Sequence, residues 1–169
     1  MVPLELRPFV LEDEDDALRA WRDFQGSRFA FLTSYYEGQA WPEYLEMLSR
    51  YREGRDLPED HVPGTLLAAL ADGVLVGRVS IRFRLNEYLA TYGGHIGYAV
   101  IERYRRRGYA TEILRRALEI LAAKGVSPAL LTCDDDNIGS ATVIERCGGR
   151  LERVGPDEHG VPFRRYWVG

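Results

Sequence analysis

Residues 100–111 read Val-Ile-Glu-Arg-Tyr-Arg-Arg-Arg-Gly-Tyr-Ala-Thr. An apolar run ends at the first of them, and an amphipathic helix is predicted to begin directly after Gly108. The start of a helix carries unpaired backbone N–H groups and about half a positive charge, so it can bind a phosphate oxygen without a dedicated side chain. Gly108 has no Cβ, which lets a phosphate approach the main chain and lets φ turn positive. We therefore predict a pyrophosphate-binding turn here, to which Arg105, Arg106 and Arg107 add charge-assisted donors.

The helix after this turn is supported by its own pattern. Its apolar residues recur at helical spacing, with charged residues on the other faces. These apolar residues are Ile113, Ala117, Leu118 and Leu121. Lys124-Gly125 then supplies a cationic last turn and a stop. An Arg-x-x-Gly-x-Ala hexapeptide alone is a weak signal, but a strand before it and a helix behind it favour phosphate binding over a merely solvated basic turn.

The turn around Gly108 and two further segments of the chain together resemble the motifs of a known protein family. Arg105, Gly108 and Ala110 fit the form Gln/Arg-x-x-Gly-x-Gly/Ala, which is the pyrophosphate loop of the GNAT superfamily of acyl-CoA-dependent N-acyltransferases. The segment Asn137–Gly149 resembles the second signature of that family, an Asn and a Ser that open a helix ending at Gly-Gly. Glu5-Leu6-Arg7-Pro8 is similar to its first strand and turn. The resemblance covers most of the chain, although residues 25–64 contribute little to it.

Length and composition fit one soluble domain over residues 1–169. No apolar stretch approaches the roughly 18 residues of a membrane span, and the N-terminal sequence lacks the pattern of a signal peptide, so we expect a cytoplasmic protein. Cys133 and Cys147 do not form a Cys-x-x-Cys pair and suit a reducing compartment. The net charge of −4 argues against a general nucleic-acid binder, because such domains usually carry an excess of basic residues over a whole face. The positive charge of this chain is instead concentrated around Gly108.

Periodicity and turn signals divide the chain into seven strands and four helices. The expected strands are Leu4–Arg7, Thr65–Ala71, Val74–Leu85, Gly94–Val100, Ala129–Cys133, Arg150–Val154 and Phe163–Val168. The expected helices are Glu12–Trp21, Trp41–Arg52, the helix after Gly108 and Ser140–Arg146. Asp72-Gly73 is a strong hairpin signal. Ser80 and Arg82 alternate with apolar neighbours, which is typical of a half-exposed strand.

This order of elements predicts an α/β (α+β) fold, with a mixed, mostly antiparallel sheet and helices on both faces. It is the order expected of the GNAT fold. The resemblance further implies that the central strands Gly94–Val100 and Ala129–Cys133 are splayed, and that a bulge in the first of them causes the splay.

The resemblance also implies how acetyl-CoA binds as a co-substrate. The pantetheine arm would lie between the splayed strands and pair with backbone groups of Tyr98, Ala99 and Val100, and a main-chain N–H near Val100 would polarise the thioester carbonyl. Asn137 is expected to contact the pantetheine, with Ser140 as a helix cap or a ligand contact. The residues expected around the pyrophosphate are Arg105, Arg106, Arg107, Gly108, Tyr109, Ala110 and Thr111.

Two catalytic roles are less clear from the residues. His95 is the candidate general base, because it enters the site where relatives often have Glu and titrates near neutral pH; a strand-edge hydrogen bond would explain it equally well. Many family members carry a Tyr that protonates the thiolate of CoA, and the corresponding residue here is Ile144. Tyr98 and Tyr104 are candidate substitutes.

The sequence therefore predicts an acetyl-CoA-dependent N-acetyltransferase that works by direct transfer to an amine. The alternative is a non-catalytic acyl-CoA sensor, suggested by Ile144. No metal is expected, because the histidines lack ligand spacing and Ile138 interrupts a calcium-loop-like run. Neither nucleic acid nor membrane is expected as a partner. The sequence does not decide between a monomer and a homodimer.

Overall fold

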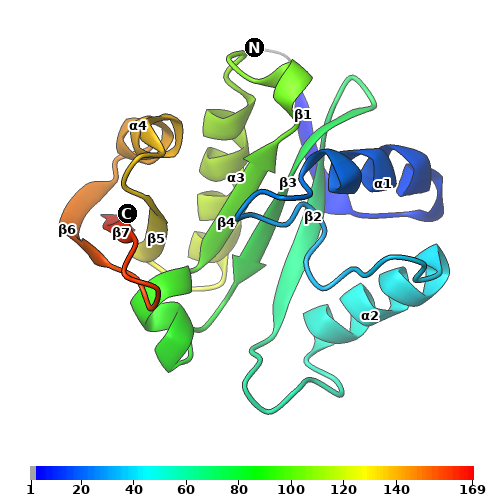
Figure 1. Cartoon of the computed structure of the whole chain (residues 1–169), viewed down its shortest axis with the longest axis horizontal. Coiled ribbons are helices and arrows are strands. Elements are labelled where there is room, and N and C mark those ends of the chain that lie inside the picture. The colour runs from blue at the N-terminus through cyan, green and yellow to red at the C-terminus, as the bar shows by residue number, and fades with distance from the viewer. Residues whose placement is uncertain (1–2) are drawn as a thin grey trace.

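The computed structural model describes residues 3–169 as two antiparallel sheets with helices packed on both faces (Figure 1). The two preceding residues, part of the segment tested for a signal peptide, lie outside that range. The first sheet has the order β1 (Leu4–Pro8), β2 (Gly64–Ala71), β3 (Val74–Arg82) and β4 (Ile96–Val100). The second has the order β5 (Ala129–Asp134), β7 (Pro162–Val168) and β6 (Arg150–Pro156). The helices are α1 (Glu14–Asp23), α2 (Trp41–Glu53), α3 (Tyr109–Ala123) and α4 (Ile138–Arg146).

The predicted fold class is confirmed, and so is the order of the strands and helices. The structure adds three short turns of helix, at Leu11–Asp13, Leu89–Gly93 and Glu102–Tyr104. The π-helical turn Leu89–Gly93 fills the connection between β3 and β4, so β3 ends three residues earlier than predicted and β4 begins two residues later.

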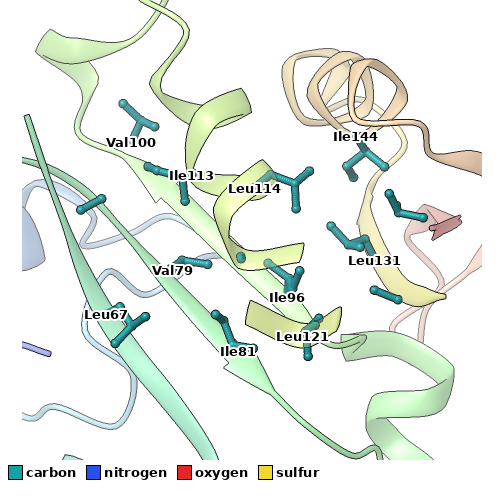
Figure 2. Packing of buried hydrophobic residues seen from close by; sticks show 14 of the residues in the cluster. Leu67, Val79, Ile81, Ile96, Val100, Ile113, Leu114, Leu121, Leu131 and Ile144 are labelled. Atoms are coloured by element: carbon teal, nitrogen blue, oxygen red, sulfur yellow. The ribbon is translucent and has the colours of Figure 1, made fainter. Parts of the chain in front are cut away.

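One core lies between the sheets and the helices α3 and α4 (Figure 2). Ile113, Ala117 and Leu121 of the predicted apolar stripe of α3 are fully buried there, and Leu118 is partly buried. The stripe packs on the side chains of β3 and β4 that alternate toward it, such as Val79, Ile81 and Ile96. This packing fixes the N-terminus of α3 against the end of β4, which is where the candidate site begins.

A second core lies on the opposite face of the first sheet, beneath α1 and α2. Trp41, Tyr44 and Phe31 are buried there against alternate residues of β2. The aromatic rings contact one another edge-on or tilted, with centroids 4.9–6.5 Å apart for the pairs that join the segment between the helices to α1 and α2. Because both faces of the sheet are covered, Ser80 on β3 is only 3% exposed, and the prediction of a half-exposed strand is wrong there.

The central strands β4 and β5 are splayed, as predicted, but the expected bulge is not in the ladder that β4 forms with β3. That ladder runs without a shift from Ile81 opposite Ile96 to Gly77 opposite Val100. The shift lies instead between β2 and β3, after Ala69. Among the described residues no ladder joins β4 to β5.

The two strands meet at a single point at their base. The His95 backbone N–H donates to the Leu130 carbonyl at 2.7 Å. This approach requires a glycine just before it, because a Cβ on Gly94 would lie 2.5 Å from the Leu130 carbonyl oxygen, and because φ of Gly94 is +69°. Beyond this point the strands diverge toward their carboxyl ends.

Candidate active site

The edge of β4 that faces β5 offers main-chain groups that pair with no other described strand. The Ile101 N–H donates to Val76 on β3, and the His95 carbonyl accepts from Arg82 on β3. Main-chain groups alternate in direction along an antiparallel strand, so those of Tyr98 and Val100 face away from β3, into the gap. The groups of Ala99 face β3. The alternation therefore favours Tyr98 and Val100 over Ala99 as main-chain partners of a ligand in the gap.

The predicted phosphate turn lies at the open end of this gap. Gly108 is the N-cap of α3 with φ +83°, and no side chain caps the helix. The N–H groups of Tyr109, Ala110 and Thr111 thus lack intrahelical partners. A Cβ built on Gly108 meets nothing within 4 Å, so no other group crowds the turn at this residue. The backbone can bind an anion here.

The arginines of the turn have different roles. Arg105 is tied to β4, since its Nε donates to the Val100 carbonyl at 3.2 Å. Arg107 lies over the Tyr104 ring at 5.8 Å, and Arg103 lies over the same ring at 4.9 Å. Arg106 adopts the left-handed conformation with φ +64° and is exposed. Arg106 and Arg107 therefore remain available to a ligand, while Arg105 shapes the turn.

The first turn of α3 contains a carboxylate with two arginine partners. Glu112 is only 8% exposed and accepts hydrogen bonds from Arg115 at 2.8 and 3.0 Å and from Arg116 at 2.7 Å. The hydrogen bonds from Arg115, followed by those from Arg116, lower the pKa of Glu112 to about 2, against the opposing effect of burial. A lowered carboxyl pKa stabilises the fold above its unfolded pKa, and this stabilisation is lost as the pH falls toward 2.

We expect Glu112→Gln to lower the free energy of unfolding by about 1–2 kcal/mol at pH 7, a value that allows for the exposure of the arginines. The difference from the wild type should shrink as the pH falls below about 4.5. Urea unfolding at pH 7, 4.5 and 3 measures both. Glu119→Gln is the control, because Glu119 pairs with Arg115 from an exposed position and should change stability by less than about 0.5 kcal/mol. An undiminished difference at pH 3 would contradict this origin of the stability.

Ser140 was a predicted cap of α4, but the structure has Asn137 in that role. The Asn137 Oδ1 accepts from the Ser140 backbone N–H at 3.0 Å, so Asn137, and not Ser140, is the N-cap. The Ser140 hydroxyl is instead 2.9 Å from the hydroxyl of Tyr98 across the gap. Burial raises the pKa of Tyr98 above its usual value, so the phenol is protonated at neutral pH. The cap and the cross-gap contact thus come from different residues.

Ile144, which stands where many family members are expected to have a catalytic tyrosine, is part of the hydrophobic core. Ile144 is 0% exposed and packs in the cluster beneath α3 and α4 (Figure 2). Cys133, at the end of β5, borders the same gap, and burial raises its pKa to about 11. Its thiol is therefore neutral and is a poor nucleophile at pH 7. Tyr98 and Ser140 are the hydroxyl groups that face one another at this place.

His95 holds the base of the gap. Its Nδ1 accepts the Leu130 N–H at 2.9 Å, so a neutral imidazole there carries its proton on Nε2. Burial is the main cause that lowers the pKa of His95. A general base needs a free lone pair, and this contact occupies one nitrogen while the other carries hydrogen. The assignment as base stays a prediction from the sequence, and the geometry favours the structural role.

Two substitutions separate these roles. His95→Ala should lower stability by about 1–3 kcal/mol, because it leaves the buried Leu130 N–H without an acceptor. His95→Asn offers Oδ1 as an acceptor and removes the titrating group, so we expect most of the stability and of kcat/KM to be retained. The pH profile of kcat/KM is the measurement. If the Asn variant folds normally but loses its rate and the acidic limb of the profile, His95 is the base.

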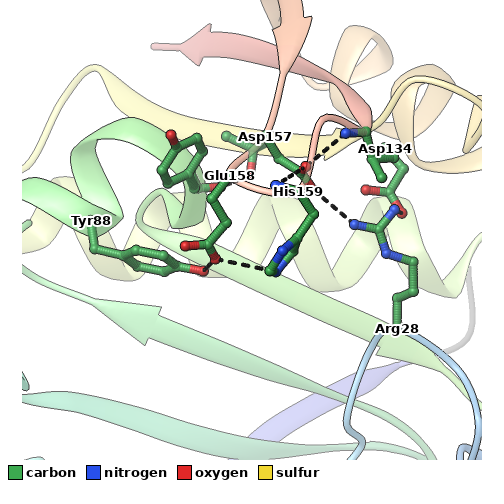
Figure 3. Close-up of polar contacts among 9 residues, drawn as sticks. Arg28, Tyr88, Asp134, Asp157, Glu158 and His159 are labelled. Atoms are coloured by element: carbon green, nitrogen blue, oxygen red, sulfur yellow. Dashed lines mark hydrogen bonds and ion pairs between the residues drawn. The ribbon is translucent and has the colours of Figure 1, made fainter.

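Polar side chains for which no role was predicted from the sequence connect distant segments of the chain (Figure 3). Arg28, in the segment between α1 and α2, lies 2.8 Å from Asp157 and 3.5 Å from Asp134. The Tyr88 hydroxyl donates to Glu158 at 3.1 Å. These contacts connect the tip of the β6–β7 hairpin to the segment between α1 and α2 and to the segment between β3 and β4. The partners are up to 129 positions apart, so no local pattern announces them.

Two other features are absent from residues 3–169. No group of three or more His, Cys, Asp or Glu side chains there is arranged to hold a metal ion. None of the helices in the same range has the length and hydropathy needed to cross a bilayer.

Comparisons with known proteins address the family and the fold. The model of the acetyltransferase (GNAT) domain matches residues 3–150. RimJ of Mycobacterium smegmatis, solved in complex with CoA-disulfide, has 20% identity and a TM-score of 0.70, over 98% of this chain and 81% of that one. YncA of Salmonella typhimurium, solved with its cofactor acetyl-CoA, has 11% identity and a TM-score of 0.68, over 98% and 92%. A GNAT-family acetyltransferase from Bordetella pertussis has 18% identity and a TM-score of 0.69, over 98% and 95%. No curated protein sequence matches the chain.

Proposed function

Because this chain belongs to the acetyltransferase (GNAT) family, we propose that it transfers an acetyl group from acetyl-CoA to a primary amine by direct attack in a ternary complex. One observation carries the proposal: the uncapped N-terminus of α3 lies at the open end of the gap between β4 and β5. Anion donors and a row of unpaired strand groups thus follow one another along a single path. Acetyl-CoA has matching parts, a pyrophosphate followed by an amide-bearing arm.

In this proposal the pyrophosphate binds the N–H groups of Tyr109, Ala110 and Thr111, with Arg106 and Arg107 nearby. The pantetheine arm extends along β4 as an added strand would. The side-chain amide of Asn137, at the start of α4, would contact the arm. The Val100 N–H then donates to the thioester oxygen, where negative charge develops as the amine attacks.

The amine must be neutral to attack. For a lysine-like amine with a pKa near 10.4, neutralisation at pH 7 costs about 4.6 kcal/mol, whereas an α-amine with a pKa of about 7.7–8.0 costs only about 1 kcal/mol. His95 is held by Leu130, so a strong dedicated base is not evident on this face. We therefore propose an α-amine as the acceptor, since it needs little help from a base.

The thiolate of CoA can leave without being protonated, but a proton donor speeds its release. We propose that the phenol of Tyr98 supplies this proton and recovers one through the Ser140 hydroxyl, which is 2.9 Å away. Tyr98 points from β4 into the gap and is protonated at neutral pH. It would replace the tyrosine that many family members have in place of Ile144.

The alternative function is an acyl-CoA sensor that binds the thioester without turning it over. Release of free CoA in the presence of a panel of α-amines tests the two functions. We expect CoA release that depends on both acetyl-CoA and an amine. Tight binding of acetyl-CoA without release on any amine would favour the sensor.

A further inference from the structure

Arg78 on β3 is a buried cation without a carboxylate partner. Its side chain is on the face of the sheet that α1 and α2 cover, and the residue is only 3% exposed. The guanidinium donates to the Gly97 carbonyl at 3.1 Å and to the Ala30 carbonyl. Its Nε is buried and has no hydrogen-bond partner among the described residues. Burial lowers the pKa of Arg78, as expected of a cation that lacks a counter-ion.

An arginine in this state is costly for the fold. Buried charges are normally paired, because carbonyl oxygens compensate only part of the lost hydration. The ion pairs found within residues 3–169 include neither Arg78 nor its neighbour Arg82, which donates to the Gly94 carbonyl at 3.2 Å. Two cations thus share this face of β3 without an acidic partner. Such an arrangement is typical of a site for an anion.

On one side, a partly exposed aromatic ring separates Arg78 from solvent. The ring of Phe29 stacks over the guanidinium at 4.1 Å and is itself 38% exposed. Phe29 and Ala30 belong to the segment 24–40 between α1 and α2, which forms neither helix nor strand. An anion could reach the guanidinium if Phe29 moved aside and the anion took the place of the Ala30 carbonyl.

This cation lies next to the proposed reaction centre. Arg78 is paired with Ala99 in the β3–β4 ladder, and its guanidinium reaches back to Gly97. A Cβ on Gly97 would lie 3.7 Å from the Phe29 ring and 4.0 Å from Arg78 Nη1. The backbone at Gly97 is therefore covered by the Phe29 ring and by no side chain of its own. Three residues of strand, roughly 10 Å, separate Gly97 from Val100.

We propose that Arg78 binds a carboxylate of the acceptor, and that the acceptor carries this carboxylate several bonds from its amine, as a dipeptide does. The inference rests on the proposed function, because it places the amine at the thioester beside Val100. The carboxylate would bind the free Nε and one Nη of Arg78 as a bidentate pair. With the Phe29 ring displaced, the bare backbone at Gly97 would leave room for the peptide main chain between the two ends.

Matched acceptors test this proposal directly. Glycylglycine and alanylalanine are compared with their C-terminal amides, at saturating acetyl-CoA and with CoA release as the signal. We expect kcat/KM to be about 100-fold higher for the free acids in the wild type. In Arg78→Met this ratio should fall to about 1, whereas Arg78→Lys should keep part of it. The ratio does not depend on the fraction of folded protein, so a destabilised variant still gives an answer.

Arg84→Met is the control, since Arg84 follows β3, is exposed and carries the same charge. It should keep the ratio of the wild type. A wild-type ratio near 1, or a ratio that persists in Arg78→Met, would overturn the role of Arg78 while leaving acetyl transfer intact. If acetyl-CoA binds but neither the peptides nor any other amine is acetylated, the proposed function fails, and the inference fails with it.

Discussion

Gly108→Val is expected to weaken the binding of acetyl-CoA by about 100-fold, which corresponds to about 2.7 kcal/mol. Valine is strained at the φ of +83° that Gly108 adopts, so the turn should shift and withdraw the N–H groups of α3 from the pyrophosphate. Because a Cβ on Gly108 meets nothing within 4 Å, the effect comes from backbone strain and not from a clash inside the protein. Isothermal titration calorimetry with acetyl-CoA measures the effect.

The chain offers a closely matched control at the other end of the same helix. Gly125 has φ +77°, and a Cβ there also meets nothing within 4 Å. Gly125→Val should therefore cost a similar amount of stability, about 1–3 kcal/mol, without changing the affinity for acetyl-CoA. If both variants lose affinity equally, the loss comes from destabilisation, and the phosphate turn has no special role.

Tyr98→Phe is expected to lower kcat by about 100- to 1,000-fold while the affinity for acetyl-CoA changes little. The substitution removes only the hydroxyl that we propose as the proton donor, and it also removes the contact with Ser140, at a cost of about 1 kcal/mol in stability. Steady-state kinetics with one amine, together with calorimetry for acetyl-CoA, separates the two effects.

Two companions sharpen this test. Tyr104→Phe is the control, because the Tyr104 ring packs under Arg103 and Arg107, away from the contact between Tyr98 and Ser140. It should keep kcat. Ser140→Ala should lower kcat by less than Tyr98→Phe, since water can take the place of the serine hydroxyl. A normal kcat in Tyr98→Phe would exclude the phenol as the proton donor.

The features that the sequence predicted well are local. The hairpin at Asp72-Gly73 is a two-residue turn between β2 and β3, and the stripe of α3 follows from helical spacing alone. The turn with positive φ at Gly108, at the start of α3, is also contained in a few consecutive residues, and its binding of phosphate stays a prediction. Each of these depends on near neighbours in the chain, so the pattern of residue types was sufficient.

The features that the sequence missed depend on distant parts of the chain. His95 binds Leu130, which is 35 positions away, and Arg28 pairs with Asp157 across 129 positions. Arg78 is buried because the irregular segment 24–40 covers β3, and that segment has no periodicity from which its position could be inferred. The splay was implied by the family resemblance, but its geometry follows from the one approach of His95 to Leu130, and not from a bulge in the ladder of β4 with β3.

The central claim is that the backbone at the start of α3 binds the pyrophosphate of acetyl-CoA. Calorimetry of the intact protein with acetyl-CoA and with acetyl-pantetheine tests it most directly, because both ligands carry the same thioester and arm and only the first has the phosphorylated adenosine diphosphate that contains the pyrophosphate. The account predicts that acetyl-CoA binds at least about 100-fold more tightly. Equal affinities, or no heat with acetyl-CoA, would contradict it.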